Sequence, residues 1–156
     1  MVLSYRLKKK ELIFLLDLFG DVNTLYQKFG VVYIDDAEHT ELAKGLHKKG
    51  MVTVSKNTVT VDHGIEFIMK KMYSSDIVFS DDRLDMWCYC CDDFIVVITV
   101  SKRDTGEYLV TPIKDIGELF EKLEECEVTG VSVKKGVCGE YDITVLRKLL
   151  SEFWNG

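Results

Sequence analysis

The sequence predicts an α+β fold, with a winged-helix-like N-terminal part followed by an antiparallel β-meander with flanking helices. Apolar residues recur at helical spacing before residue 73 and after residue 115, whereas four short runs rich in β-branched and aromatic residues fill the stretch between. At 156 residues, with 47% apolar and 29% charged residues, the chain fits a single globular domain over 1–156. Within that domain two lobes, 1–73 and 76–156, are possible.

The winged-helix-like part begins with a predicted helix from about Lys8 to Phe19, which Gly20 ends. This helix has one buried face because an i, i+3, i+4, i+7 spacing relates Leu12, Leu15, Leu16 and Phe19. A short helix or turn is expected at 23–29, and a small strand at 31–34.

A second long helix and a hairpin complete this part. Asp35 or Asp36 is expected to cap a helix that runs to about Lys48, where basic side chains suit the negative end of the helix dipole. Two β-branched runs then predict a hairpin over 51–61, and Asp62 is placed to cap another helix. The order helix, short helix, helix and hairpin is typical of a winged helix.

The second half of the chain is expected to be built on a sheet. Four consecutive strands are predicted at 77–79, 84–90, 94–101 and 107–113. The turns between them are too short for crossovers, so neighbouring strands should be antiparallel. Asp115 and Asp142 are expected to cap two further helices, with one more strand at 128–134.

Composition and charge narrow the choice of partners and compartment. The net charge is −6, and because phosphate binding relies on clustered Lys and Arg, a nucleic-acid partner is disfavoured. The five cysteines lack the regular spacing of a disulfide framework and are expected to be reduced. No apolar run is long enough to span a bilayer, and Asp17 interrupts the apolar N-terminal stretch. A cytoplasmic protein without membrane insertion is expected, and its oligomeric state stays open.

No residues assemble into a recognisable active site. The sequence contains none of the nucleotide-binding, zinc-protease or serine-hydrolase motifs, so no catalytic, cofactor-binding or metal-binding residue is predicted. Paired aspartates such as Asp81-Asp82 and Asp92-Asp93 lie at predicted turns, where aspartate is favoured by its own backbone hydrogen bonding. A catalytic Cys–His or Ser–His pair meeting only in the fold keeps an enzyme as a third hypothesis.

One strand offers candidate protein-binding residues. Strand alternation over 84–90 directs Trp87 and Tyr89 to one side and the cysteines to the other. The aspartate at 85 on the aromatic side suggests a half-exposed face, and exposed Trp and Tyr are favoured anchors at protein interfaces. Trp87 and Tyr89 are therefore predicted to bind a protein partner, unless a helix covers them.

The winged-helix-like order suggests one functional hypothesis, a DNA-binding transcriptional regulator. In a DNA-binding transcriptional regulator, the helix from Asp35 would be the recognition helix and GMVTVSKNTVTVD the wing. Asp36, Glu38 and Glu41 in the first turns of that helix would repel DNA, and Lys56 is the only basic residue of the wing. The sequence therefore favours a protein-binding role and keeps the regulator as the alternative.

The order of elements over roughly residues 4–125 resembles one half of the EspG family of type VII (ESX) secretion-associated proteins. The stretches that carry the resemblance are SYRLKKKELIFLLDLFG, LAKGLHKKGMVTVSKNTVTVDHGIEFIMKKM and IVFS…FIVVITVS…GEYLVTPIKDIGELFEKLEE. The resemblance implies a non-enzymatic cytosolic chaperone or adaptor that binds a secreted helical substrate before export, with no cofactor.

Overall fold

A computed structural model describes residues 4–19, 34–56, 58–81, 86–92, 94–100 and 106–155. The chain forms two compact units. One consists of Met1–Arg6 together with Ser74–Gly156, and the other of Leu7–Tyr73. No helix among the described residues is both long and apolar enough to cross a bilayer.

The larger unit is built on a seven-stranded sheet with the strand order β1-β7-β6-β5-β4-β8-β9. The strands of this sheet are β1 (Tyr5–Lys8), whose last two residues belong to the smaller unit, β4 (Ile77–Asp81), β5 (Met86–Cys90), β6 (Ile95–Val100), β7 (Glu107–Ile113), β8 (Gly130–Lys135) and β9 (Gly139–Asp142). Strands β4 to β7 are neighbours in chain order and pair antiparallel, as short turns require. Strand β8 pairs with the free side of β4, and β9 pairs with β8.

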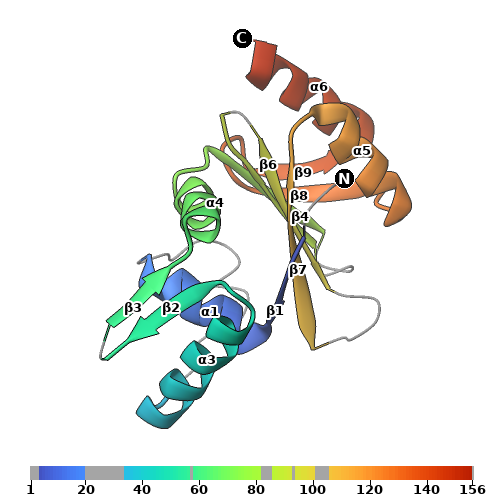
Figure 1. Ribbon diagram of the computed structural model, residues 1–156. Helices are drawn as coiled ribbons and strands as arrows, with labels where there is room; N and C mark the ends of the chain where they lie inside the picture. The colour runs from blue at the N-terminus through green and yellow to red at the C-terminus, as the bar shows by residue number, and fades with distance from the viewer. Residues whose placement is uncertain are drawn as a thin grey trace. The chain divides into compact units, whose positions relative to one another are not determined.

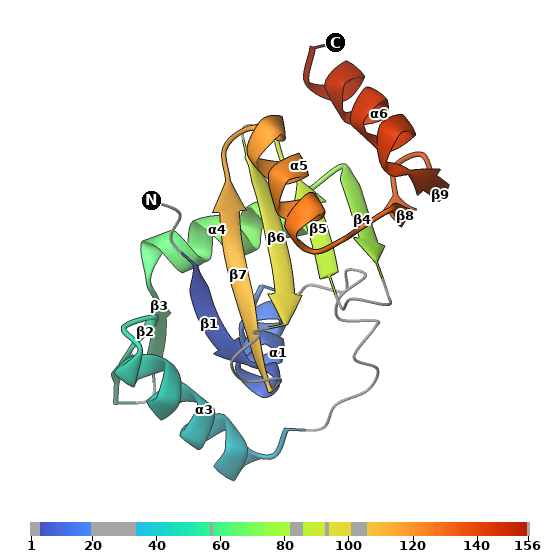
Figure 2. The same cartoon turned by 90° about the vertical axis from the view of Figure 1, so that its right-hand side faces the viewer.

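Helices α5 (Ile116–Glu125) and α6 (Ile143–Asn155) lie against one face of this sheet (Figures 1 and 2). Alternate residues of the central strands point to these helices and meet their apolar stripes. The resulting core includes Phe79, Met86, Cys88, Cys90, Val97, Leu119, Leu123, Leu146 and Leu150. Each helix begins at an aspartate cap, since Asp115 accepts a 2.7 Å bond from the Glu118 amide and Asp142 a 2.8 Å bond from the Val145 amide.

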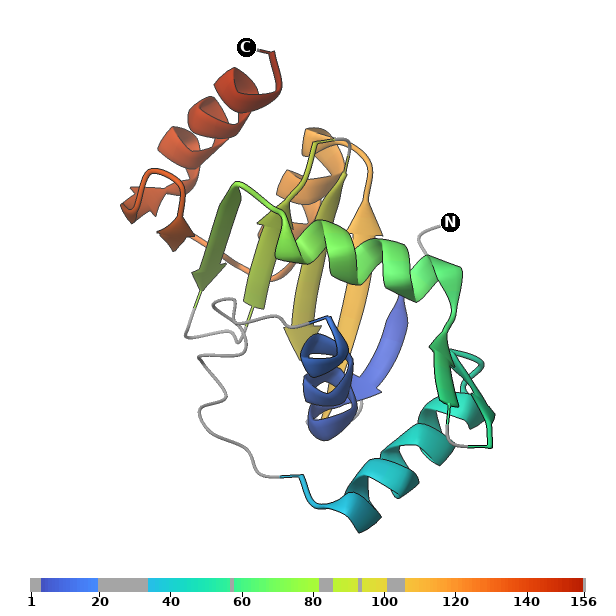
Figure 3. The ribbon, with the colours of Figure 1, turned by 90° about the vertical axis from the view of Figure 1, so that its left-hand side faces the viewer.

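The smaller unit contains three helices and a hairpin among its described residues: α1 (Lys9–Leu18), α3 (Asp36–Lys48), β2 (Val52–Ser55), β3 (Thr58–Val61) and α4 (His63–Tyr73). Asp35 caps α3 by accepting a 2.8 Å hydrogen bond from the Glu38 amide. Helix α3, cyan in Figure 3, leads directly into the β2–β3 hairpin. The α4 helix buries the stripe formed by Ile65, Ile68, Met69 and Met72.

The α+β class and the antiparallel meander are confirmed. Two strands were not predicted: β9, and β1, which directly precedes the helix expected from about Lys8 to Phe19 and found as α1. The meander is extended on both sides into a larger sheet. The short helix predicted at 23–29 and most of the strand predicted at 31–34 lie outside the described residues, so the winged-helix-like part stays a prediction.

Candidate functional site

The two predicted protein-binding residues, Trp87 and Tyr89, lie on β5 near the middle of the sheet. The predicted alternation is correct, because Cys88 and Cys90 join the core beneath α5 and α6 whereas Trp87 and Tyr89 point to the other face. The expected half-exposed face is wrong: Trp87 is 1% exposed and Tyr89 is fully buried. Every residue of β5 is buried, as in a central strand covered on both faces. Whether these two side chains bind a partner stays a prediction.

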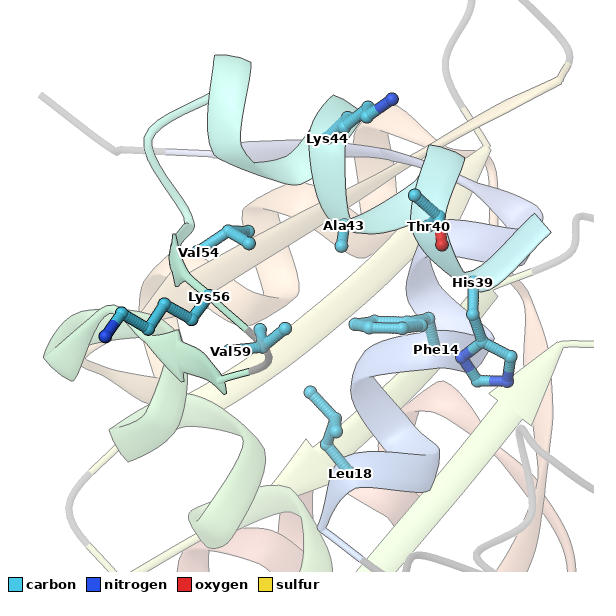
Figure 4. Close-up of a pocket in the computed structure, with 9 residues that line it drawn as sticks. All are labelled: Phe14, Leu18, His39, Thr40, Ala43, Lys44, Val54, Lys56 and Val59. Atoms are coloured by element: carbon cyan, nitrogen blue, oxygen red, sulfur yellow. The ribbon is translucent and has the colours of Figure 1, made fainter. Parts of the chain in front are cut away.

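A different surface feature offers a binding site within the smaller unit. A groove of about 530 Å³ lies between α1, α3 and the β2–β3 hairpin (Figure 4). Its lining residues come from all three elements: Phe14, Leu18, His39, Thr40, Ala43, Lys44, Val54, Lys56 and Val59. The inner surface of the groove is formed mostly by apolar side chains such as Phe14, Ala43 and Val59. Lys44 and Lys56 lie at its rim.

The hairpin contributes an apolar face to this groove. Val54 pairs with Val59 and Val52 pairs with Val61, so the four valines share one face of the two strands. The opposite face carries Thr53 and its cross-strand neighbours, which are polar. Although valine side chains are usually covered, Val54 is 41% exposed. The hairpin therefore has an apolar face that the described residues cover only in part.

Helix α1 supplies the second apolar wall. Phe14 and Leu18 are four residues apart and so lie on the same side of the helix, facing the groove (Figure 4). Phe14 is buried, and its ring lies 5.4 Å from the His39 ring, centroid to centroid, at a tilted angle. Leu18, by contrast, is 48% exposed, so the groove's apolar surface continues into solvent at this end.

Helix α3 supplies the third wall and one of two lysines on the rim. Ala43 faces the floor, and its small side chain leaves the groove open above it (Figure 4). Lys44 and Lys56 extend outward from opposite walls, and the part of the lining that the structure describes contains no Asp or Glu. Lys44 lies 3.7 Å from Glu41 on the same helix, but both side chains are largely exposed and the pair is weak.

A buried ion pair fixes α1 against α3. The Glu11 carboxylate accepts a 2.8 Å hydrogen bond from the Lys8 amide and a 2.6 Å bond from the Lys49 ammonium, just past the end of α3. Close approach of the two helices also depends on Gly45, because a Cβ there would lie 3.1 Å from a Glu11 carboxylate oxygen. These contacts set the spacing of two of the three groove walls.

A second, smaller cavity of about 320 Å³ belongs to the larger unit. It lies beside α5, where Glu118, Glu121 and Glu125 line it together with Lys122. At its other side the Ser4 and Thr111 hydroxyls are 2.7 Å apart. The described residues contain no group of three or more His, Cys, Asp or Glu side chains placed to hold a metal ion.

The two cysteines of β5 are core residues. All five cysteines of the chain are free, and Cys88, Cys90 and Cys91 are buried. Burial, reinforced by neighbouring thiols, raises the pKa of both Cys88 and Cys90, so these thiols stay protonated at neutral pH. They act as small apolar side chains in the core of the sheet.

No protein-family model matches the sequence, and no curated protein or solved structure was found to be similar to it. The groove residues were not singled out from the sequence. One signal would have indicated them: the alternation of valine with threonine or serine over 52–61, which predicts a hairpin with one apolar face.

Proposed function

We propose that the chain is a non-enzymatic protein-binding adaptor or chaperone, and that the groove between α1, α3 and the hairpin holds an apolar segment of its partner. The observation that carries the proposal is the pair Leu18 and Val54, each nearly half exposed, on opposite walls of one groove. Covering the exposed parts of these two side chains would contribute about 1 kcal/mol each. Exposed apolar surface rimmed by polar residues is typical of interaction sites.

The exposure of the walls favours a macromolecular partner over a small ligand. Small-molecule pockets bury most of the ligand's surface, which requires walls that are themselves enclosed. Here Leu18 and Val54 remain accessible along the groove's edges, so side chains projecting from another protein can enter from the open side. The resemblance to type VII secretion chaperones implies a secreted helical protein as the partner. We include this partner in the proposal.

A DNA-binding regulator is the alternative, and the charges on α3 count against it. Asp36, Glu38 and Glu41 occupy the N-terminal half of α3, the part that a recognition helix presents to base edges and phosphates. Glu38 is also engaged by the Lys10 ammonium, which takes one of the few clustered cations away from a possible phosphate contact. The N-terminal half of α3, which a DNA reader would use, is acidic.

The proposal can be tested by site-specific photo-crosslinking in cells of the native host. A photoreactive amino acid is placed at Val54, which faces the groove, and in a matched variant at Thr53, its neighbour on the opposite face of the same strand. We expect a protein cross-link from position 54 and not from position 53. The cross-linked partner peptide should be amphipathic, and the Leu18→Ser substitution should weaken the cross-link.

Three results would contradict the proposal. Equal cross-linking from both positions would mean that the groove does not select the partner. Cross-links only to a second copy of this chain would replace the adaptor with a self-associating protein. Cross-links to DNA that disappear with rising salt would restore the transcriptional regulator.

A further inference from the structure

The rim of the groove is basic in an acidic protein. Lys44 and Lys56 lie on its rim and no Asp or Glu is among the described residues that line it, although the whole chain carries a net charge of −6. Apolar walls between two cations complement a partner that places carboxylates beside its apolar side chains. We propose, building on the proposed function of the groove, that the partner segment is an acidic amphipathic helix whose carboxylates pair with Lys44 and Lys56.

The helical form follows from which part of the hairpin meets the groove. A partner strand would bind by pairing its backbone with an open strand edge. The groove is lined instead by the side chains of the cross-strand pair Val54 and Val59, so the hairpin presents its face. A segment lying on side chains gains no backbone hydrogen bonds from them and must satisfy its own, which a helix does.

The backbone conformation of Lys56 allows its charge to be removed without destabilising the hairpin turn. Lys56 lies in the hairpin turn with φ at 52°, a left-handed conformation that Asn and Gly adopt more readily than Lys. Replacing Lys56 with Asn should therefore stabilise the turn while removing the charge. A weaker partner complex formed by this variant could not be attributed to a less stable fold.

The experiment is a selection from a displayed library of random peptides of about 16 residues, long enough to form a helix on binding. The full chain is used as bait, beside a Lys44→Gln/Lys56→Asn variant and a Leu18→Ser/Val54→Ser variant. Peptides selected on the unaltered chain should have apolar residues at helical spacing and be enriched in Asp and Glu. An enriched peptide should bind the lysine variant about 2- to 30-fold more weakly and lose affinity with added salt.

The outcomes separate this inference from the function on which it rests. Peptides that bind the Leu18→Ser/Val54→Ser variant equally well would overturn the groove function itself. Groove-dependent peptides without acidic enrichment, or with alternating instead of helical apolar spacing, would overturn only the acidic helix. The Lys56→Arg variant keeps the charge, so it should bind as well as the unaltered chain if pairing is electrostatic.

Discussion

Replacing Lys49 with methionine tests whether the buried ion pair stabilises the smaller unit. The Glu11 side chain is only 4% exposed, and without Lys49 its carboxylate keeps only one of its two described hydrogen bonds, that from the Lys8 amide. Removing one member of a fully buried pair costs about 3–5 kcal/mol. The Lys49 side chain is 30% exposed, so water reaches the pair. We therefore expect a smaller loss, about 1.5–3 kcal/mol.

A double-mutant cycle isolates the pair from other contacts of Lys49. In Glu11→Gln the side-chain oxygen can still accept the bond from the Lys8 amide, and the Lys49 ammonium can turn to water. That change should cost about 1 kcal/mol. Once the carboxylate is absent, Lys49→Met leaves no buried charge without its partner. The substitution should then lower the free energy of unfolding by less than about 0.5 kcal/mol. The difference between the two backgrounds is the coupling energy of the pair.

Hydrogen exchange with mass spectrometry is the suitable assay, because a single unfolding curve could mix the two compact units. Peptides from α1 and α3 should lose protection in Lys49→Met, whereas peptides from β5 and β6 report the larger unit and serve as an internal control. An equal cost of Lys49→Met with and without the Glu11 carboxylate would refute the argument. It would mean that Lys49 acts through its alkyl stem or another contact.

Two further predictions concern the larger unit. Leu146→Ala should destabilise it by about 2–5 kcal/mol, measured by hydrogen exchange of peptides from β5 and β6, because Leu146 is fully buried. Val145→Ala, at an exposed position of the same helix, should change stability by less than about 0.5 kcal/mol. Equal effects would show that α6 does not pack as described. With iodoacetamide at pH 8, exposed Cys138 should be alkylated while Cys88 and Cys90, whose thiol pKa values are raised by burial, stay unmodified until denaturant is added. Labelling of the two strand cysteines in the native protein would contradict their burial.

The sequence predicted those helices and strands that are determined by residues close together in the chain. Helices such as α5 and α6 carry both a capping aspartate and an apolar stripe, so periodicity and capping chemistry locate them without knowledge of the fold. The hairpin and the meander strands were predicted for the same reason, since short turns force sequential strands to pair.

The missed strands depend on distant partners. Strand β1 has a single fully buried residue, Leu7, between charged neighbours, and it becomes a strand by pairing with β7 about a hundred residues later. Strand β9 is mostly exposed and pairs at the sheet's edge with β8. Neither segment has a hydrophobic period of its own, so nothing local distinguishes it from a loop or a helix start.

The candidate site was missed for a related reason. Alternation correctly predicted the direction of Trp87 and Tyr89, but exposure depends on what covers a sheet face, which one strand cannot reveal. The groove, in turn, joins residues from α1, α3 and the hairpin that are up to 45 positions apart, from Phe14 to Val59. Only the valine alternation of the hairpin was visible locally.

Both units expose apolar side chains, since Val137 and Val145 of the larger unit are about as exposed as Leu18 and Val54. The strongest structural argument for placing partner binding in the smaller unit is that Leu18 and Val54 line one groove. In the larger unit, α5 and α6 bury their apolar stripes in the core beneath the sheet, through residues such as Leu119 and Leu146. In the smaller unit, Leu18 and Val54 stay exposed although they lie on elements whose other apolar residues are buried. Exposed apolar surface does not stabilise a fold, and when it lies in a groove with a basic rim it matches a partner that is both apolar and acidic.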